Sequence, residues 1–238
     1  MTMGMFADVL AIVVGGLLGS FGGKMLPERL KDALPPTFAV ATFGMAILSI
    51  VKMSSLPVVI LALILGVIIG TGLSLEKYLR HAGEWAAAVI VRRGTADPAE
   101  RARNLEFFSI AVILFCTGPT GIYGAMRASV TGDNTLLFSK CVLDIFTAFV
   151  FAANAGIIIS LLSIPMFLVY LFLAVVSGGI APLLTPEMVA DFSGCGGLLI
   201  LATGFRMAEV KMFRVTDMLP ALLLVMPISY LWRLLPIA

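Results

Sequence analysis

Long apolar runs, separated by short polar stretches, recur along the whole 238-residue chain. A helix that crosses a bilayer needs about 20 mostly apolar residues, and the runs have about this length. The pattern therefore predicts eight membrane-spanning helices, at residues 5–23, 36–53, 57–75, 105–127, 136–162, 164–183, 193–208 and 217–235. The fifth is long enough to tilt or bend. The first lacks a preceding basic stretch, so we expect it to remain as a membrane helix rather than be removed as a signal peptide.

The longest polar interruption, residues 76–104, begins with an amphipathic pattern. In EKYLRHAGEWAAAVIVRR (76–93), apolar residues recur at helical spacing and most charged residues occupy the other side. Such a helix is typical of the membrane surface, although a short helix packed on the bundle explains the pattern equally well. In the loop that follows, Asp97 can cap a helix that begins at Pro98.

Composition agrees with a membrane protein, because 60% of the residues are hydrophobic and only 13% are charged. Soluble domains carry about 25% charged residues. The chain has a single histidine, His81, and three cysteines without a CxxC motif, so we expect no metal site, no cofactor and no enzyme activity. The expected partners are the lipid bilayer and an unidentified small solute or ion, but no nucleic acid. The oligomeric state, a homodimer included, stays open.

The distribution of basic residues predicts the orientation of the spans. Cytoplasmic loops collect Lys and Arg. With the N-terminus outside, twelve of the sixteen basic residues fall in cytoplasmic loops, Lys52, Arg127 and Arg233 lie outside, and Lys140 lies within a span. We therefore expect both termini to lie on the outer side of the membrane, periplasmic or extracellular.

Two parts of the chain resemble each other. PERLKD (27–32) matches PEMVAD (186–191), and without a gap VKM (51–53) then matches VKM (210–212), giving six identities in 27 positions. The alternative is chance similarity between apolar helices. If the repeat is real, each copy holds three spans, and an offset of five spans makes the copies point in opposite directions. Inverted three-span repeats are typical of secondary transporters, with the solute site near mid-membrane.

The expected fold is therefore an all-α, polytopic membrane helix bundle of about eight transmembrane segments. Inverted three-helix repeats flank a central helix pair within a single integral membrane domain. The predicted parts are repeat one at about 5–75, the surface helix and loop at 76–104, the central pair at 105–162 and repeat two at about 164–235.

Two features of the central pair carry candidate chemistry. Lys140 and Asp144 stand four residues apart in an apolar span and can pair on one helical face. Each alone would cost about 2.5–3.5 kcal/mol at the bilayer centre, so we expect either an ion or proton site around Asp144, or a structural pair in which Lys140 extends toward the outer surface. In the preceding span, Pro119 either breaks the helix, which frees backbone groups to bind a solute, or kinks it only. The candidate ligands there are Cys116, Thr117, Gly118, Pro119, Thr120 and Gly121, with Asn154 as a further polar group.

Small residues at spacings of four favour close helix packing. They are Gly15, Gly19 and Gly23 in the first span, and Gly66 and Gly70 in the third. SGCGGLL (193–199) opens the predicted seventh span, where an exposed helix N-terminus could receive an anion.

Several motifs in combination resemble the bacterial domain-of-unknown-function family 554, the YqgA/YdfK-like inner-membrane proteins. The motifs are GGLLG followed by LPERL, then LFCTGP, TGDNTLLFSKCVLD, GGLLILATG and RVTDMLPALLL, and they cover nearly the whole chain. The resemblance implies a multi-pass inner-membrane protein, often proposed as a transporter, without established substrate or catalytic residues. It matches the family's glycine-proline break to Gly118–Pro119, its Gly-Asp turn to Gly132–Asp133, and its Lys-x-x-x-Asp to Lys140 and Asp144. Three charged residues replace the polar amides expected of this family, at Asp8, Arg206 and Asp217.

The favoured function is transport of a small solute or ion, coupled to protons or sodium. A channel with a static pore and a non-transporting membrane scaffold or sensor remain the alternatives. Coupled transport predicts saturable, gradient-driven flux, a channel predicts conductance without coupling, and a scaffold predicts a co-purifying partner.

Overall fold

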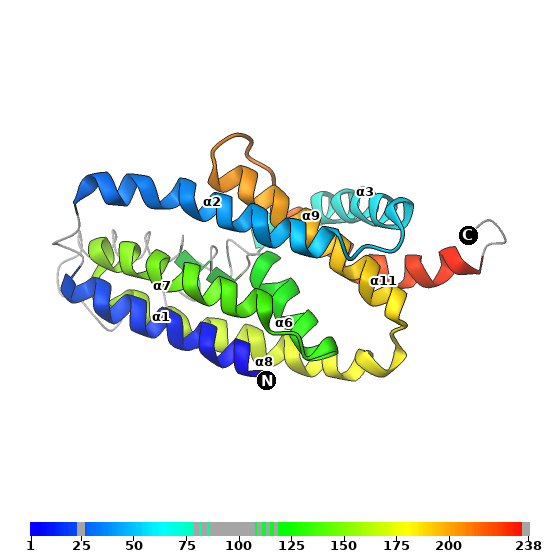
Figure 1. The fold of residues 1–238 in the computed structure, drawn as a ribbon, viewed down its shortest axis with the longest axis horizontal. Helices are drawn as coiled ribbons and strands as arrows, with labels where there is room; N and C mark the ends of the chain where they lie inside the picture. The colour runs from blue at the N-terminus through cyan, green and yellow to red at the C-terminus, as the bar shows by residue number, and fades with distance from the viewer. Residues whose placement is uncertain are drawn as a thin grey trace. The chain divides into compact units, whose positions relative to one another are not determined.

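The computed structural model describes residues 1–22, 27–78, 81, 85, 108, 111–112, 115–116 and 119–234. The regular secondary structure of these residues is helical (Figure 1). The helices are α1 (Met3–Gly22), α2 (Glu28–Ile50), α3 (Leu56–Gly72), α6 (Pro119–Thr131), α7 (Thr135–Ala155), η2 (Gly156–Leu162), α8 (Ser163–Ile180), η3 (Ala181–Leu183), α9 (Pro186–Met207), α10 (Val215–Met218) and α11 (Pro220–Arg233). The η segments are 3₁₀-helices.

Most of these helices have the length and composition of membrane spans. Among the described residues, five segments are long and apolar enough to cross a bilayer: Met3–Gly22, Thr135–Ala153, Gly156–Leu183, Pro186–Met207 and Val215–Arg233. Shorter apolar helices are Pro36–Ile50 and Leu56–Gly72. The prediction of an all-α membrane helix bundle is therefore confirmed.

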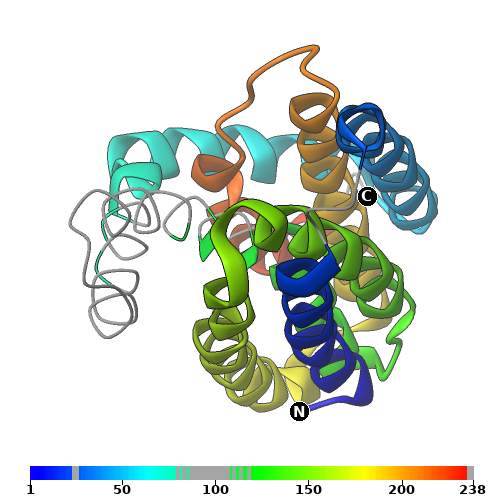
Figure 2. The same cartoon turned by 90° about the vertical axis from the view of Figure 1, so that its left-hand side faces the viewer.

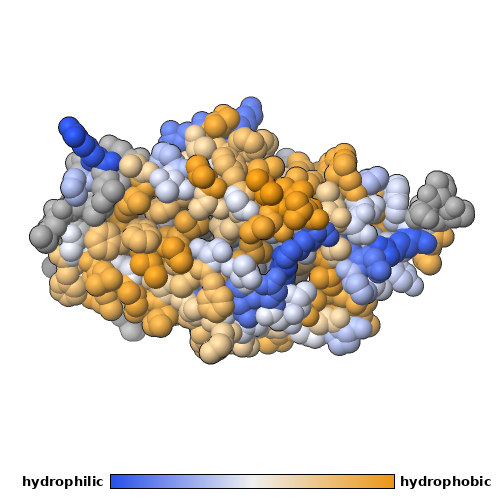
Figure 3. All heavy atoms as spheres, viewed as in Figure 1, coloured by the Kyte–Doolittle hydropathy of each residue, from blue (hydrophilic) through white to orange (hydrophobic). Residues whose placement is uncertain are grey.

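The two faces of α7 show how such a bundle differs from a soluble protein. Phe138, Val142 and Phe146, spaced four residues apart, are exposed, whereas Lys140 and Asp144 are buried on the other side of the same helix. The surface in Figure 3 is correspondingly dominated by hydrophobic residues, drawn in orange. Apolar side chains that face outward and charges that face inward suit a helix surrounded by lipid.

The chain divides into two compact units, and the first consists of residues 1–33 and 77–177. Within it, α1 lies beside α7, as Figures 1 and 2 show in blue and green. Glycines of α1 meet α7 in the same order along both helices: Gly4 at Leu137, Gly15 at Ile145 and Gly19 at Phe149. The two helices therefore run parallel.

The other helices of the first unit run against these neighbours. Gly16 of α1 meets Ser160 of η2, while the ring of Phe6 lies 6.4 Å from that of Phe167 in α8, so α1 is antiparallel to the η2–α8 segment. Gly124 of α6 meets Leu137 and Gly121 meets Lys140, so α6 is antiparallel to α7. These directions are those expected of spans that cross a membrane alternately.

The second unit consists of residues 34–76 and 178–238, and two helix pairs pack antiparallel within it. In the pair of α9 and α2, Gly197 meets Ile50 and Gly204 meets Phe43, and Gly194 meets Met53 just after the end of α2. In the pair of α3 and α11, Gly66 meets Ala221, and Gly70 meets Asp217 in the adjoining α10. Each close contact occurs at a glycine because a Cβ there would overlap the facing helix.

Several predicted helix boundaries are wrong. The predicted fifth span, 136–162, does not continue to residue 162, because α7 ends at Ala155 and Gly156 adopts φ +72°, a conformation that only glycine enters readily. The segment that follows begins at Gly156 rather than at residue 164. Similarly, α9 begins at Pro186 instead of residue 193, because Thr185 caps it by accepting a hydrogen bond from the backbone N–H of Met188.

The predicted surface helix at 76–93 and the loop after it lie largely outside the described residues. Residues 75–78, 81 and 85 are helical.

Candidate functional site

A cluster of charged side chains lies inside the first unit. Lys140 and Asp144 of α7 are 6% and 7% exposed, and Asp8 of α1 is fully buried. The Lys140 ammonium donates a hydrogen bond to Asp8 Oδ2 at 2.9 Å and another to Asp144 Oδ2. Lys140 therefore pairs with two carboxylates on two helices, and not only with the one four residues away.

A tyrosine and a phenylalanine complete the surroundings of this cluster. The Tyr170 hydroxyl of α8 donates to the same oxygen, Asp8 Oδ2, at 2.5 Å. The Lys140 ammonium also lies 5.9 Å from the centre of the Phe115 ring, within the range of a cation–π interaction. We call Asp8, Lys140, Asp144 and Tyr170 the charged cluster.

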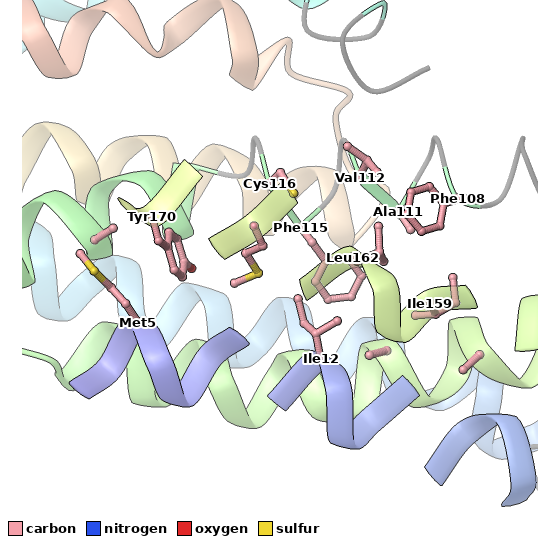
Figure 4. Packing of buried hydrophobic residues seen from close by; sticks show 14 of the residues in the cluster. Met5, Ile12, Phe108, Ala111, Val112, Phe115, Cys116, Ile159, Leu162 and Tyr170 are labelled. Carbon is pink, nitrogen blue, oxygen red and sulfur yellow. The ribbon is translucent and has the colours of Figure 1, made fainter. Parts of the chain in front are cut away.

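The charged cluster lies in a hydrophobic core. Figure 4 shows Met5 and Ile12 projecting from α1 toward Tyr170 and Leu162, and all four side chains are buried. Burial in apolar surroundings makes unpaired charge costly, because apolar groups do not solvate a charge as water does. Charge balance inside the cluster therefore decides how stable each of its protonation states is.

The charges do not balance when all three groups are ionised. Two carboxylates and one ammonium leave an excess of one negative charge. One carboxylate oxygen, Asp8 Oδ1, is also buried without a hydrogen-bond partner among the described residues. Buried polar atoms usually have partners, so this oxygen marks a place where the cluster can take up a positive charge.

Close packing of α1 against α7 brings Asp8 to Lys140. At Gly15 and Gly19 the α1 backbone lies so close to Ile145 and Phe149 that a Cβ would overlap their carbonyl oxygens. These two glycines were predicted to allow close helix packing, and the structure shows that the helix they contact is α7. Gly66 and Gly70 make equivalent close contacts in the second unit, and Gly23 lies outside the described residues.

Of the candidate ligands around Pro119, Gly121 lies directly against the charged cluster. A Cβ at Gly121 would stand 3.1 Å from the Tyr170 hydroxyl and 3.2 Å from Lys140 Cε, so only glycine lets α6 approach without displacing them. Cys116 and Thr120 are buried, and Pro119 is the first residue of α6. Thr117 and Gly118 lie outside the described residues, as does the side chain of Asn154.

Sequence reasoning missed Asp8 and Tyr170. The sequence could have identified Asp8, because it is a lone carboxylate within the predicted first span and needs a partner there as much as Asp144 does. Tyr170 gives no such signal, since tyrosine is common in apolar helices. Only the packing of α1 against α8 shows that its hydroxyl faces Asp8.

Two further buried carboxylates, both in the second unit, have structural roles. Asp191 accepts hydrogen bonds from the backbone N–H groups of Ser54 and Ser55 at the start of α3, and from the Ser229 hydroxyl. Asp217 accepts one from the backbone N–H of Glu76. Helix N-termini favour negative charge, so both aspartates hold helix ends in place.

The anion site suggested at SGCGGLL is wrong. Ser193 lies inside α9, and its hydroxyl donates a hydrogen bond to the carbonyl of Val189, one turn earlier in the same helix. Among the described residues, His, Cys, Asp and Glu also form no group of three that could hold a metal ion.

Comparison with known proteins gives consistent matches over nearly the whole chain. The model of a family described as "Protein of unknown function (DUF554)" matches residues 3–230. The uncharacterized protein YqgA of Escherichia coli K12 is 43% identical over 232 residues, which cover 98% of both chains. The uncharacterized membrane protein YdfK of Bacillus subtilis 168 is 25% identical over 229 residues, covering 93% of both. No solved structure matches the chain.

Proposed function

The chain belongs to the DUF554 family, and we propose that it is a membrane transporter for a small solute or ion, driven by a gradient of protons or sodium. The observation that carries this proposal is the charged cluster. Asp8, Lys140 and Asp144 are buried where three apolar helices meet, and their charges do not cancel. Ionisable groups inside membrane helices are costly, and they commonly mark ion or proton pathways.

The packing directions in the second unit support the proposal. In the sequence repeat, α2 corresponds to α9 and α3 corresponds to α11. Both pairs pack antiparallel, as a two-fold axis that exchanges the two helices of each pair requires. Such an axis in the membrane plane is the symmetry of inverted-repeat transporters.

The test is flux into liposomes that contain the purified protein. A thermal-shift screen against ions, amino acids, sugars and organic acids first selects the solutes to use. We expect saturable uptake driven by an imposed proton or sodium gradient, which Asp144→Asn abolishes while the protein stays folded. Glu209→Gln, which removes a carboxylate from an exposed loop, is the matched control and should leave the flux unchanged.

Other results would favour the other functions. Conductance without coupling to either gradient would indicate a channel. A folded protein without flux or conductance, together with a co-purifying partner, would indicate a scaffold or sensor. Full coupled transport by Asp144→Asn would remove the charged cluster from the mechanism.

A further inference from the structure

The charged cluster fits one particular coupling ion. We propose that Asp8 and Asp144 together bind one proton, so that the cluster of two aspartates and Lys140 is neutral when it is loaded. This inference rests on the proposed function only in calling the proton a coupling ion, since the proton site itself can be observed without transport.

Charge balance is the first argument. Lys140 compensates one carboxylate, and the second has no counter-charge among the described residues that contact the cluster. Within the described part of the chain, the other titratable groups beside the two aspartates and Lys140 are the Tyr170 hydroxyl of α8 and the thiols of Cys116 and Cys141, which add no positive charge. Arg127 of α6 pairs instead with Asp133, at 2.7 Å.

The unpartnered oxygen is the second argument. Asp8 Oδ2 accepts hydrogen bonds from both Lys140 and Tyr170, whereas Asp8 Oδ1 accepts none from the described residues although Asp8 is fully buried. An ionised carboxylate in such a place lacks donors on one side, and the penalty for burial falls when the pair holds a proton. Because Asp8 and Asp144 share Lys140, the proton belongs to the pair and not to either residue alone.

The position of Lys140 argues against sodium. Its ammonium already lies between Asp8 Oδ2 and Asp144 Oδ2, so a metal ion would have only the other oxygen of each carboxylate as a ligand from these two residues. The Phe115 ring on another side suits an ammonium group but supplies no oxygen. A proton needs neither the space nor additional ligands, so it can bind while Lys140 stays in place.

This arrangement gives a physical basis for coupling. When a carboxylate takes a proton from water on one side of the membrane, the cluster becomes a neutral carboxylic acid beside an ion pair. Release to the other side restores the carboxylate and its excess charge. The arrangement of α1, α7 and α8 that buries the cluster is favoured only in the loaded state, because an uncompensated charge is strongly disfavoured in an apolar core.

Infrared spectroscopy of the full-length protein in lipid tests the proposal directly. A protonated carboxyl group shows a C=O stretching band that shifts in D₂O, whereas an ionised one does not show it. At neutral pH we expect this band in the wild-type protein. It should disappear in Asp8→Asn and in Asp144→Asn, because each variant leaves a neutral pair of Lys140 with one carboxylate.

Three controls make the outcome decisive. Asp191→Asn should leave the band unchanged, because Asp191 is also buried but lies in the second unit, where it accepts three hydrogen bonds and takes no part in the charged cluster. Lys140→Met should increase the band, since both carboxylates then lack a counter-charge. Replacing choline chloride with sodium chloride should have no effect on the wild-type band.

The proposal fails if the wild-type band is absent, if it survives in both Asp8→Asn and Asp144→Asn, or if sodium removes it. A band with the expected behaviour in a protein without flux would retain the proton site and reject the transporter. Sodium-driven flux without the band would support the proposed transport function and contradict the proposed proton site.

Discussion

At the scale of single residues, Lys140 is the centre of the charged cluster. The spacing of Lys140 and Asp144 in the sequence predicts a pair, and a pair would leave Lys140 without a partner if Asp144 were removed. The structure adds Asp8 as a second partner, at 2.9 Å from the ammonium. The consequences of substitution therefore differ from those of an isolated pair: removing either aspartate leaves a balanced pair, whereas removing the lysine leaves two carboxylates.

Lys140→Met should therefore destabilise the protein more than Asp144→Asn. Removing one partner of a buried ion pair commonly costs about 3–5 kcal/mol, because the other charge is left uncompensated. In Asp144→Asn, Lys140 keeps Asp8, so we expect a loss of about 1 kcal/mol, comparable with one hydrogen bond. Thermal unfolding of the two detergent-solubilised variants shows which of them is less stable. An Asp144→Asn protein as unstable as Lys140→Met would show that Asp8 does not compensate Lys140.

Tyr170→Phe should lower the free energy of unfolding by about 1.5–3 kcal/mol, the usual contribution of a hydrogen bond to a charged group. The change removes only the hydroxyl that donates to Asp8 Oδ2 and keeps the ring in the core. Tyr230→Phe, at an exposed tyrosine of α11, is the control and should have little effect. Equal unfolding temperatures for the two variants would mean that the Tyr170–Asp8 bond contributes nothing.

At the scale of helices, hydropathy predicts which segments are apolar but does not predict where helices end. The turn at Gly156 is invisible to hydropathy because the residues on both sides are apolar, and only the backbone angle of the glycine marks it. The start of α9 was missed for the opposite reason. Glu187 and Asp191 are polar, so they fell outside the predicted span, although Thr185 and Pro186 are a good helix start.

Glycine spacing predicts close packing but not the partner helix, and this can be tested on α1. Gly19→Ala places a Cβ against the backbone of Phe149 and should destabilise the protein by about 1–3 kcal/mol, as overpacking usually does. Gly22→Ala, on the same helix, meets only the Phe149 ring at 3.7 Å, an ordinary contact, and should be nearly neutral. The difference between the two melting temperatures measures how closely α1 packs on α7. Similar values would contradict that packing.

At the scale of the whole molecule, the directions of the helices restrict the topology. α1 and α7 run parallel, so an odd number of membrane crossings must lie between them. The sequence predicts three, at 36–53, 57–75 and 105–127. Basic residues and helix directions are independent observations, since the first reflects charge in loops and the second reflects packing inside one unit. Both fit eight alternating spans.

This topology gives a prediction that reporter fusions can test in bacterial cells. Five predicted spans separate Thr95 from the C-terminus, so the two positions must lie on opposite sides of the membrane. A reporter that is active only outside the cytoplasm should be active when fused after Ala238 and inactive when inserted near Thr95, because the basic residues around Thr95 favour the cytoplasm. A reporter that works only in the cytoplasm should give the reverse pattern and controls for expression. If both positions report the same side, an even number of spans separates them, and the odd offset that inverts the second repeat is lost. If the two sides are exchanged, the inversion survives but the orientation is wrong.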